Sequence, residues 1–205
     1  MRILLTSNGF PEGATTITNK FFELVGKQPS DTKVAFIPTA SVVEEDRSFM
    51  VNDRARLEAI GIPVENIINL ELDHPITLDE LKKFDVIFLD GGNTFYLLEK
   101  MRESGFDKTI AEYISQDLGV FVGVSAGSIV MGPDIGFAEP WDDKTKGHLE
   151  NTKGLGYTKE AYSPHYSKEK DDIILEQLKD VGYKINPLYD GEAVLVTETE
   201  EKVIR

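Results

Sequence analysis

Residues 123–127, with the sequence Gly-Val-Ser-Ala-Gly, have the spacing of a nucleophile elbow, G-x-S-x-G. In an elbow a strand turns sharply into a helix, which exposes a serine hydroxyl and aims backbone N–H groups at the group it attacks. The flanking sequence fits, because the apolar run 119–124 predicts a buried strand and residues 128–132 predict a short helix ending at Gly-Pro. Ser125 is therefore predicted to be a catalytic nucleophile, the alternative being a serine that only caps a helix, with glycines that only serve packing.

A serine nucleophile needs a general base, and the chain contains three histidines. His165 follows a proline and lies between two tyrosines, a rigid setting that would fix an imidazole well. His74 lies in a turn before a predicted helix and is expected at the surface, and His148 lies in a polar stretch without other signals. His165 is the predicted base.

Four carboxylates are candidates for the acid that orients this base. Asp190 lies at a turn that enters a predicted strand, and Glu192 follows two residues later. Glu139 and Asp142 lie in the polar region after the elbow. Each of the four has an ordinary alternative as a solvated surface carboxylate, and residue types alone leave the choice open.

A second glycine turn, Leu-Asp-Gly-Gly-Asn-Thr-Phe at 89–95, again joins a predicted strand to a predicted helix. Its backbone N–H groups can bind an anion, and beside the elbow an oxyanion fits better than a nucleotide, because the sequence matches no phosphate-loop pattern. Asn93 and Thr94 in this turn are predicted to contact substrate. Asp90 and Asn93 also have simpler explanations as a turn former and a helix cap.

Apolar runs that alternate with amphipathic segments predict a parallel sheet with helices on both faces. The helix expected at 44–60 should bury Phe49, Met50, Ala55 and Leu57. No repeat or linker divides the chain, so residues 1–205 are expected to form one domain. Strands are predicted at 3–7, 33–38, 67–70, 85–89, 119–124 and within 183–204, helices at 16–25, 44–60, 77–83, 95–104, 108–116 and 168–181, and hairpin or loop structure at 134–162.

The composition narrows the class of partner. The formal net charge is −14 and no basic cluster offsets it, which disfavours nucleic acid and anionic membranes. Solubility is the favoured explanation of this charge, and attraction of cationic groups such as a peptide's amino terminus is the weaker alternative. The chain has no cysteine, and no stretch has the roughly 18 apolar residues of a membrane span. We expect a cytoplasmic enzyme that is a monomer or homodimer.

Four segments together resemble the dipeptidase E family of serine peptidases, which includes cyanophycinase-like relatives. They are Leu-Leu-Thr-Ser-Asn at 4–8, Asp-Gly-Gly-Asn-Thr-Phe at 90–95, Val-Ser-Ala-Gly-Ser at 124–128 and Pro-His-Tyr at 164–166. The resemblance covers nearly the whole chain. It implies a fold similar to class I glutamine amidotransferases, with serine in place of cysteine at the elbow.

The resemblance also implies roles for individual residues. It implies Ser125 as nucleophile, His165 as base, and the N–H groups of Gly92 and Ala126 as the oxyanion hole, without metal or organic cofactor. The family's third triad member is a glutamate before a late strand, and this position holds Asp190, which is one methylene shorter. Glu192 remains the alternative.

One departure from the family concerns specificity. In aspartyl dipeptidases a basic residue after the histidine is implied to bind the substrate's N-terminal aspartate, whereas residues 167–172 contain two lysines, three acids and no arginine. The expected function is therefore a serine peptidase for dipeptides or short peptides without a strong preference for N-terminal aspartate. The alternatives are an esterase or amidase on a non-peptide substrate, and an inactive binding protein of the same fold.

Overall fold

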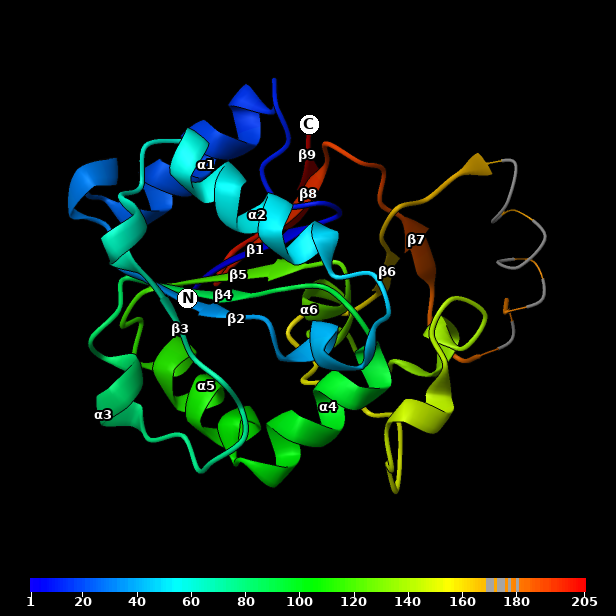
Figure 1. Ribbon diagram of the computed structural model, residues 1–205. Helices are drawn as coiled ribbons and strands as arrows, with labels where there is room; N and C mark the ends of the chain where they lie inside the picture. Colours follow the sequence, from blue (N-terminus) through cyan, green and yellow to red (C-terminus); the bar gives the residue numbers. More distant parts are fainter. Residues whose placement is uncertain (169–171, 173–175, 177, 180) are drawn as a thin grey trace.

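The computed structural model describes residues 1–168, 172, 176, 178–179 and 181–205. Its centre is a sheet of seven strands in the order β3-β2-β4-β5-β1-β8-β9 (Figure 1). The five strands from β3 to β1 run parallel, and β8 and β9 continue the sheet in antiparallel pairing. The strands are β1 Arg2–Thr6, β2 Val34–Ile37, β3 Ile67–Asn69, β4 Val86–Leu89, β5 Val120–Val124, β8 Ala193–Thr197 and β9 Glu201–Ile204.

Helices cover both faces of this sheet, as Figure 1 shows. One face carries α1 Thr15–Val25 and α2 Ser48–Ala59. The other carries α3 Leu78–Leu81, α4 Thr94–Glu103, α5 Phe106–Ser115 and α6 Ala126–Ile129. The short 3-10 helices are Pro29–Asp31, Thr39–Val43, Val64–Asn66, Gly136–Ala138 and Lys144–Lys146, and a separate two-stranded parallel sheet pairs β6 Ala161–Ser163 with β7 Ile185–Pro187.

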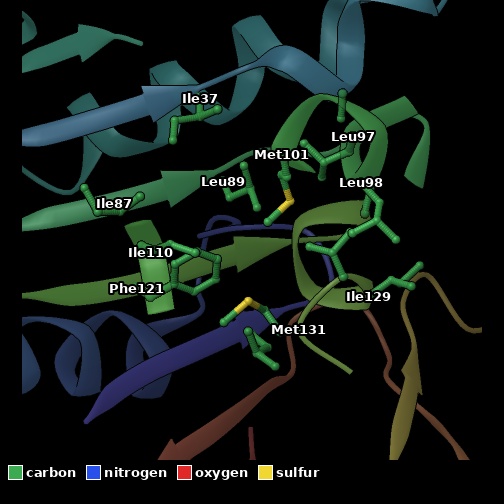
Figure 2. Close-up of a cluster of buried hydrophobic side chains, with 14 of the residues drawn as sticks. Ile37, Ile87, Leu89, Leu97, Leu98, Met101, Ile110, Phe121, Ile129 and Met131 are labelled. Atoms are coloured by element: carbon green, nitrogen blue, oxygen red, sulfur yellow. The ribbon is translucent and has the colours of Figure 1, made fainter. Parts of the chain in front are cut away.

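The alternation of side chains along the strands divides the core into two layers. On β4, Phe88 packs in the layer under α1 and α2, whereas Leu89 packs in the layer over α4 and α5. Figure 2 shows the second layer, where Met101 of α4 and Ile110 of α5 meet Leu89 and Phe121. Because both faces are covered, the parallel strands are apolar almost throughout. This confirms the predicted fold class, a mostly parallel sheet with helices on both faces.

Two predictions about α2 were wrong. The helix begins at Ser48 rather than at residue 44, because the preceding chain forms a 3-10 turn at Thr39–Val43 and then an extended segment. Its inward face also differs, since Ala55 is exposed and the polar side chain of Asp53 is buried beside Leu57. Asp53 lies in the middle of α2 beside Gly9 in the loop after β1, and apolar periodicity does not predict that contact.

Outside the sheet the chain is irregular. Residues 134–162 form two 3-10 turns, an isolated bridge between Asp134 and Lys153 and the start of β6, as the loss of periodicity predicted. The helix expected at 168–181 lies largely outside the described residues. No helix in the described part of the chain is long and apolar enough to cross a bilayer.

The sheet topology places three loops side by side. The strands β4, β5 and β1 are parallel neighbours, so the loops that follow their carboxyl ends meet at one edge of the sheet. These loops carry the glycine turn after β4, the elbow after β5 and residues 7–9 after β1. The turn before β8 reaches the same edge, because β8 runs antiparallel to β1.

Candidate active site

Ser125 lies between β5 and α6 in a strained backbone conformation. Its φ of 49° and ψ of −111° lie in a region that residues with a side chain rarely occupy, at a cost on the order of 1–3 kcal/mol. The conformation is held by its neighbours: the Ser125 N–H donates to the Thr6 carbonyl at 3.1 Å, and the Ser125 carbonyl accepts the Ser128 N–H at 2.8 Å. The serine has the geometry of a nucleophile elbow.

The glycines of the motif are required by close backbone approaches. A Cβ atom on Gly127 would overlap the carbonyl oxygen of Leu89, and one on Gly123 would overlap the carbonyl oxygen of Gly127. Only glycine therefore allows α6 to begin directly against the end of β4. These glycines are therefore required for packing as well as for the turn geometry of the elbow.

His165 and Asp190 are brought together from two separate loops. Asp190 Oδ1 lies 2.9 Å from Nδ1 of His165, although 25 residues separate them. His165 follows β6 with a φ of 52°, and Asp190 lies in the turn that leads into β8. With Nδ1 engaged by the carboxylate, Nε2 is the ring nitrogen left for a reacting group.

Ser7 contacts both His165 and Asp190, and this role was not predicted from the sequence. Its hydroxyl donates to Asp190 Oδ1 at 2.8 Å and accepts the backbone N–H of His165 at 2.7 Å. The next residue, Asn8, accepts the N–H of Gly191 through its side-chain oxygen at 3.0 Å. The signal was available in the sequence: polar residues directly after the first parallel strand must reach the edge where the elbow lies.

Two cavities meet at Ser125 and His165. One has a volume of about 390 Å³ and is lined by polar groups, including Asp190 and the backbone of Gly92. The other, of about 250 Å³, is lined mainly by apolar side chains, which are Ile129, Phe137, Ala138, Trp141 and Pro164. Larger hollows of about 600 and 840 Å³ lie elsewhere on the surface and do not include Ser125.

The glycine turn after β4 faces the serine. A Cβ atom on Gly91 would lie 3.3 Å from Cβ of Ser125. Gly92 adopts a φ of 133°, and a side chain there would overlap the carbonyl of Ala40. The N–H groups of Gly92 and Ala126 have no acceptor among the described residues. Both remain available for an oxyanion.

Asn93 and Thr94, predicted to contact substrate, are buried within the fold. The Asn93 side chain caps α4 by accepting the Tyr96 N–H at 3.0 Å, and it donates to the Asp143 carbonyl at 3.1 Å. Thr94 is fully buried, and its N–H donates to Asp142 at 2.9 Å. Neither residue lines the two cavities, so this geometry supports the capping explanation and not substrate contact.

The rival acids lie apart from the histidine ring or have other partners. Glu192 is nearly buried, forms an ion pair with Arg205 at 2.6 Å and accepts the Tyr189 N–H. Glu139 is exposed and pairs with Lys144 at 2.5 Å. Neither lines a cavity at Ser125.

Asp142 lines both cavities and is engaged by the N–H of Thr94. Burial raises the pKa of Asp142, and the hydrogen bonds from Thr94 partly offset this. Asp142 is therefore a partly buried acid beside Ser125 whose hydrogen bond is with Thr94 rather than with the imidazole.

The other two histidines lie away from the serine. His74 is exposed and contacts Asp73 at 2.7 Å, and this neighbour raises the pKa of His74. His148 is exposed, and its backbone N–H donates to Glu99 at 3.2 Å. In the described ranges no group of three or more His, Asp or Glu side chains is arranged to hold a metal ion.

This arrangement of elbow, imidazole and carboxylate agrees with comparisons against known proteins. A model of "Peptidase family S51" matches residues 3–204. The chain belongs to peptidase family S51. The membership makes it a serine-class peptidase, confirms the resemblance to the dipeptidase E family, and fits a fold similar to class I glutamine amidotransferases.

Individual relatives of this S51 chain carry matching names. It is 31% identical to the "uncharacterized peptidase Lin0382" of Listeria innocua, covering 98% of this chain and 95% of that protein. It is 27% identical to "Peptidase E" of Salmonella arizonae, covering 66% of this chain and 57% of that protein. The crystal structure of a candidate peptidase E protein from Listeria monocytogenes superimposes with a TM-score of 0.82 at 29% identity, covering 100% of this chain and 98% of that one.

Proposed function

We propose that this S51 peptidase hydrolyses dipeptides or short peptides through an acyl-enzyme, with Ser125, His165 and Asp190 as its catalytic triad. The observation that carries the proposal is that the strained serine and the Asp190-bound imidazole line one cavity. An elbow without an oriented base nearby would not activate the hydroxyl.

The chemistry follows from the positions of these groups. Ser125 Oγ attacks the peptide carbonyl carbon while Nε2 of His165 takes the hydroxyl proton. Asp190 stabilises the resulting imidazolium through Nδ1, and the N–H groups of Gly92 and Ala126 hold the oxyanion. The imidazolium then gives its proton to the leaving amine, and a water activated by the same nitrogen releases the acyl group.

The charge of the polar cavity favours a substrate with a free amino terminus. Three carboxylates besides Asp190 line it, and they are Glu44, Asp53 and Asp142, against one arginine, Arg56. Arg56 is itself paired with Asp53 at 2.6 Å. The excess of negative charge attracts an ammonium group and repels an acidic side chain.

The smaller cavity supports a second element of specificity. Phe137 and Ile129 are almost fully buried and form an apolar wall beside Ser125 and His165. A volume of about 250 Å³ accommodates a medium-sized aliphatic or aromatic side chain. Short peptides with an apolar residue next to the scissile bond fit this arrangement.

A library of dipeptides, assayed beside simple esters and amides, tests the proposal. We expect wild-type protein to release amino acids from neutral dipeptides with an apolar residue, and Ser125→Ala to lose about 10⁴-fold or more in turnover while remaining folded. Hydrolysis of esters alone, with every dipeptide inert, would indicate a non-peptide substrate. Dipeptide hydrolysis that survives in Ser125→Ala would refute the mechanism.

A further inference from the structure

Asp90 is a buried carboxyl group with no conventional partner. It directly precedes the Gly91–Gly92 turn and is fully inaccessible to solvent. Neither of its carboxyl oxygens has a donor at ordinary hydrogen-bond geometry in the described part of the chain, and the N–H of the adjacent Gly91 only partly offsets the effect of burial on its pKa. A buried carboxylate in this state would cost several kcal/mol, so the group must be neutral or share a proton with a neighbour.

The neighbour is Asp53 of α2, whose carboxyl group lies within hydrogen-bonding reach of Asp90. Asp53 is only 4% exposed, but it has a cationic partner, because Arg56 donates to its Oδ1 at 2.6 Å. The same nitrogen of Arg56 donates to the Asn8 carbonyl at 2.9 Å. Of the two acids, Asp53 therefore carries the charge.

We propose that Asp90 is a protonated positioning residue that donates a hydrogen bond to ionised Asp53 and thereby holds the Gly91–Gly92 turn against Ser125. This inference rests on the proposed function, because it assigns a role to the oxyanion-binding turn. The proton stays on Asp90 throughout the reaction, and no bond to substrate is formed or broken there.

The position of Asp90 explains how it acts on the turn. Its N–H donates to the Ile37 carbonyl at 3.0 Å, which ties its backbone to β2. Its side chain adds the link to α2, and the adjacent Gly91 leaves little room for a side chain beside Ser125. Since an oxyanion hole depends on donors fixed before the reaction, a second anchor on the donor loop increases the rate.

The same contacts connect the turn to the triad acid. From Asp53 the chain of hydrogen bonds passes through Arg56 to Asn8, whose side chain accepts the N–H of Gly191 next to Asp190. The oxyanion turn and the turn that carries the triad acid are therefore held by one continuous network.

The charges around the pair agree with one shared proton. Burial and then the charge of Asp53 raise the pKa of Asp90 well above its ordinary value. Burial also raises the pKa of Asp53, but Arg56, then the hydrogen bond with Asp90 and more weakly His165 partly offset this effect. The charged and titratable groups that line the cavity next to the pair are Glu44, Arg56, Asp142, His165 and Asp190.

A direct test observes the proton without any assay of activity. In protein labelled with ¹³C at the aspartate carboxyl carbons, we expect a resonance of a protonated carboxyl group at about pH 6, where an ordinary aspartate with a pKa near 3.9 is ionised. This resonance should be absent from Asp90→Asn. Its absence from wild-type protein, or its persistence in Asp90→Asn as the sole such signal, would overturn the proposal.

Stability should report the same proton. Above about pH 3.9 the folded protein retains a proton that the unfolded chain has lost, so the Asp90 contribution to stability falls as pH rises until the pair ionises. In urea unfolding, wild type should therefore lose stability relative to Asp90→Asn as the pH rises above about 3.9. Equal pH dependence in the two proteins would contradict a proton held by Asp90.

The positioning role is tested by the rate at which a fluorophosphonate labels Ser125. We expect Asp90→Ala to label about 10- to 100-fold more slowly, because the turn loses its anchor to α2. Asp90→Asn, which can still donate to Asp53, should stay within about threefold of wild type, and Asp79→Ala, at an exposed site on α3, should be unchanged.

The outcomes separate the two proposals. Wild-type protein that is not labelled at Ser125 would refute the proposed function. Normal labelling of wild type and of Asp90→Ala would refute the positioning role alone. If Asp90→Ala does not fold, the carboxyl resonance and Asp90→Asn decide the question.

Discussion

Replacing Asp190 by asparagine removes the negative charge beside the imidazole while preserving the shape of the side chain. In the proposed mechanism this charge matters most when His165 has taken the serine proton, because an imidazolium then faces the carboxylate. The two side chains are joined at 2.9 Å, but they are 52% and 56% exposed. Water therefore screens the pair more than it would screen a buried triad.

The magnitude follows from this exposure. Opposite unit charges about 4 Å apart interact by about 1 kcal/mol in water and about 4 kcal/mol at an effective dielectric constant near 20. Because both groups are more than half exposed, we take values up to the midpoint of this range, about 1.5–2.5 kcal/mol. At about 1.4 kcal/mol for each factor of ten, Asp190→Asn should lower kcat by about 10- to 100-fold. This is less than the roughly 10⁴-fold typical of a buried triad aspartate.

The assay is steady-state hydrolysis of a neutral dipeptide by wild type, Asp190→Asn and Glu192→Gln. The loss should appear in kcat, with KM changed by less than about threefold, because the charge acts after substrate is bound. Glu192→Gln should keep its rate, since Glu192 pairs with Arg205 instead. An Asp190→Asn enzyme within twofold of wild type, or an equal loss in Glu192→Gln, would refute this assignment of the acid.

Three further predictions concern the base, its support and the substrate. His165→Ala should abolish turnover, whereas His74→Ala and His148→Ala should keep a turnover within a few-fold of wild type, because both of these histidines lie outside the two cavities at Ser125. An inactive His148→Ala together with an active His165→Ala would contradict the choice of base. Ser7→Ala, which removes the hydroxyl between the triad members, should lower kcat about tenfold, and an unchanged rate would show that the hydroxyl is not needed. Asp-Leu should be cleaved with a kcat/KM no more than about tenfold above that of Ala-Leu, because the cavity is acidic; a larger preference would indicate an available cation, first of all Arg56.

Local features of this fold could be predicted from the sequence because they depend on neighbouring residues. The elbow at 123–127 combines an apolar strand, a small-residue turn and a short helix, and each part has its own signal. The parallel strands were evident because burial on both faces makes them apolar throughout. The start of α2 was missed, since a 3-10 turn and an extended segment replace the first helical turn there.

Contacts between distant segments were harder to predict. Asp190 was a candidate acid on the strength of its turn, but its distance from His165 depends on the register of β8 against β1. The contribution of Ser7 depends on contact with a residue 158 positions later in the chain. The burial of Asp90 next to Asp53 likewise could not be predicted from the sequence, because acidic residues in turns are ordinarily solvated.

The most direct test of the account is to identify the residue that a fluorophosphonate modifies and to follow how its modification depends on the base. Peptide mapping of labelled wild-type protein should place a single adduct on Ser125, and His165→Ala should label at least about 100-fold more slowly while remaining folded. The slow variant should retain its far-ultraviolet circular dichroism spectrum, which separates loss of activation from loss of structure. An adduct on another residue, or rapid labelling of Ser125 in His165→Ala, would contradict a serine activated by this histidine.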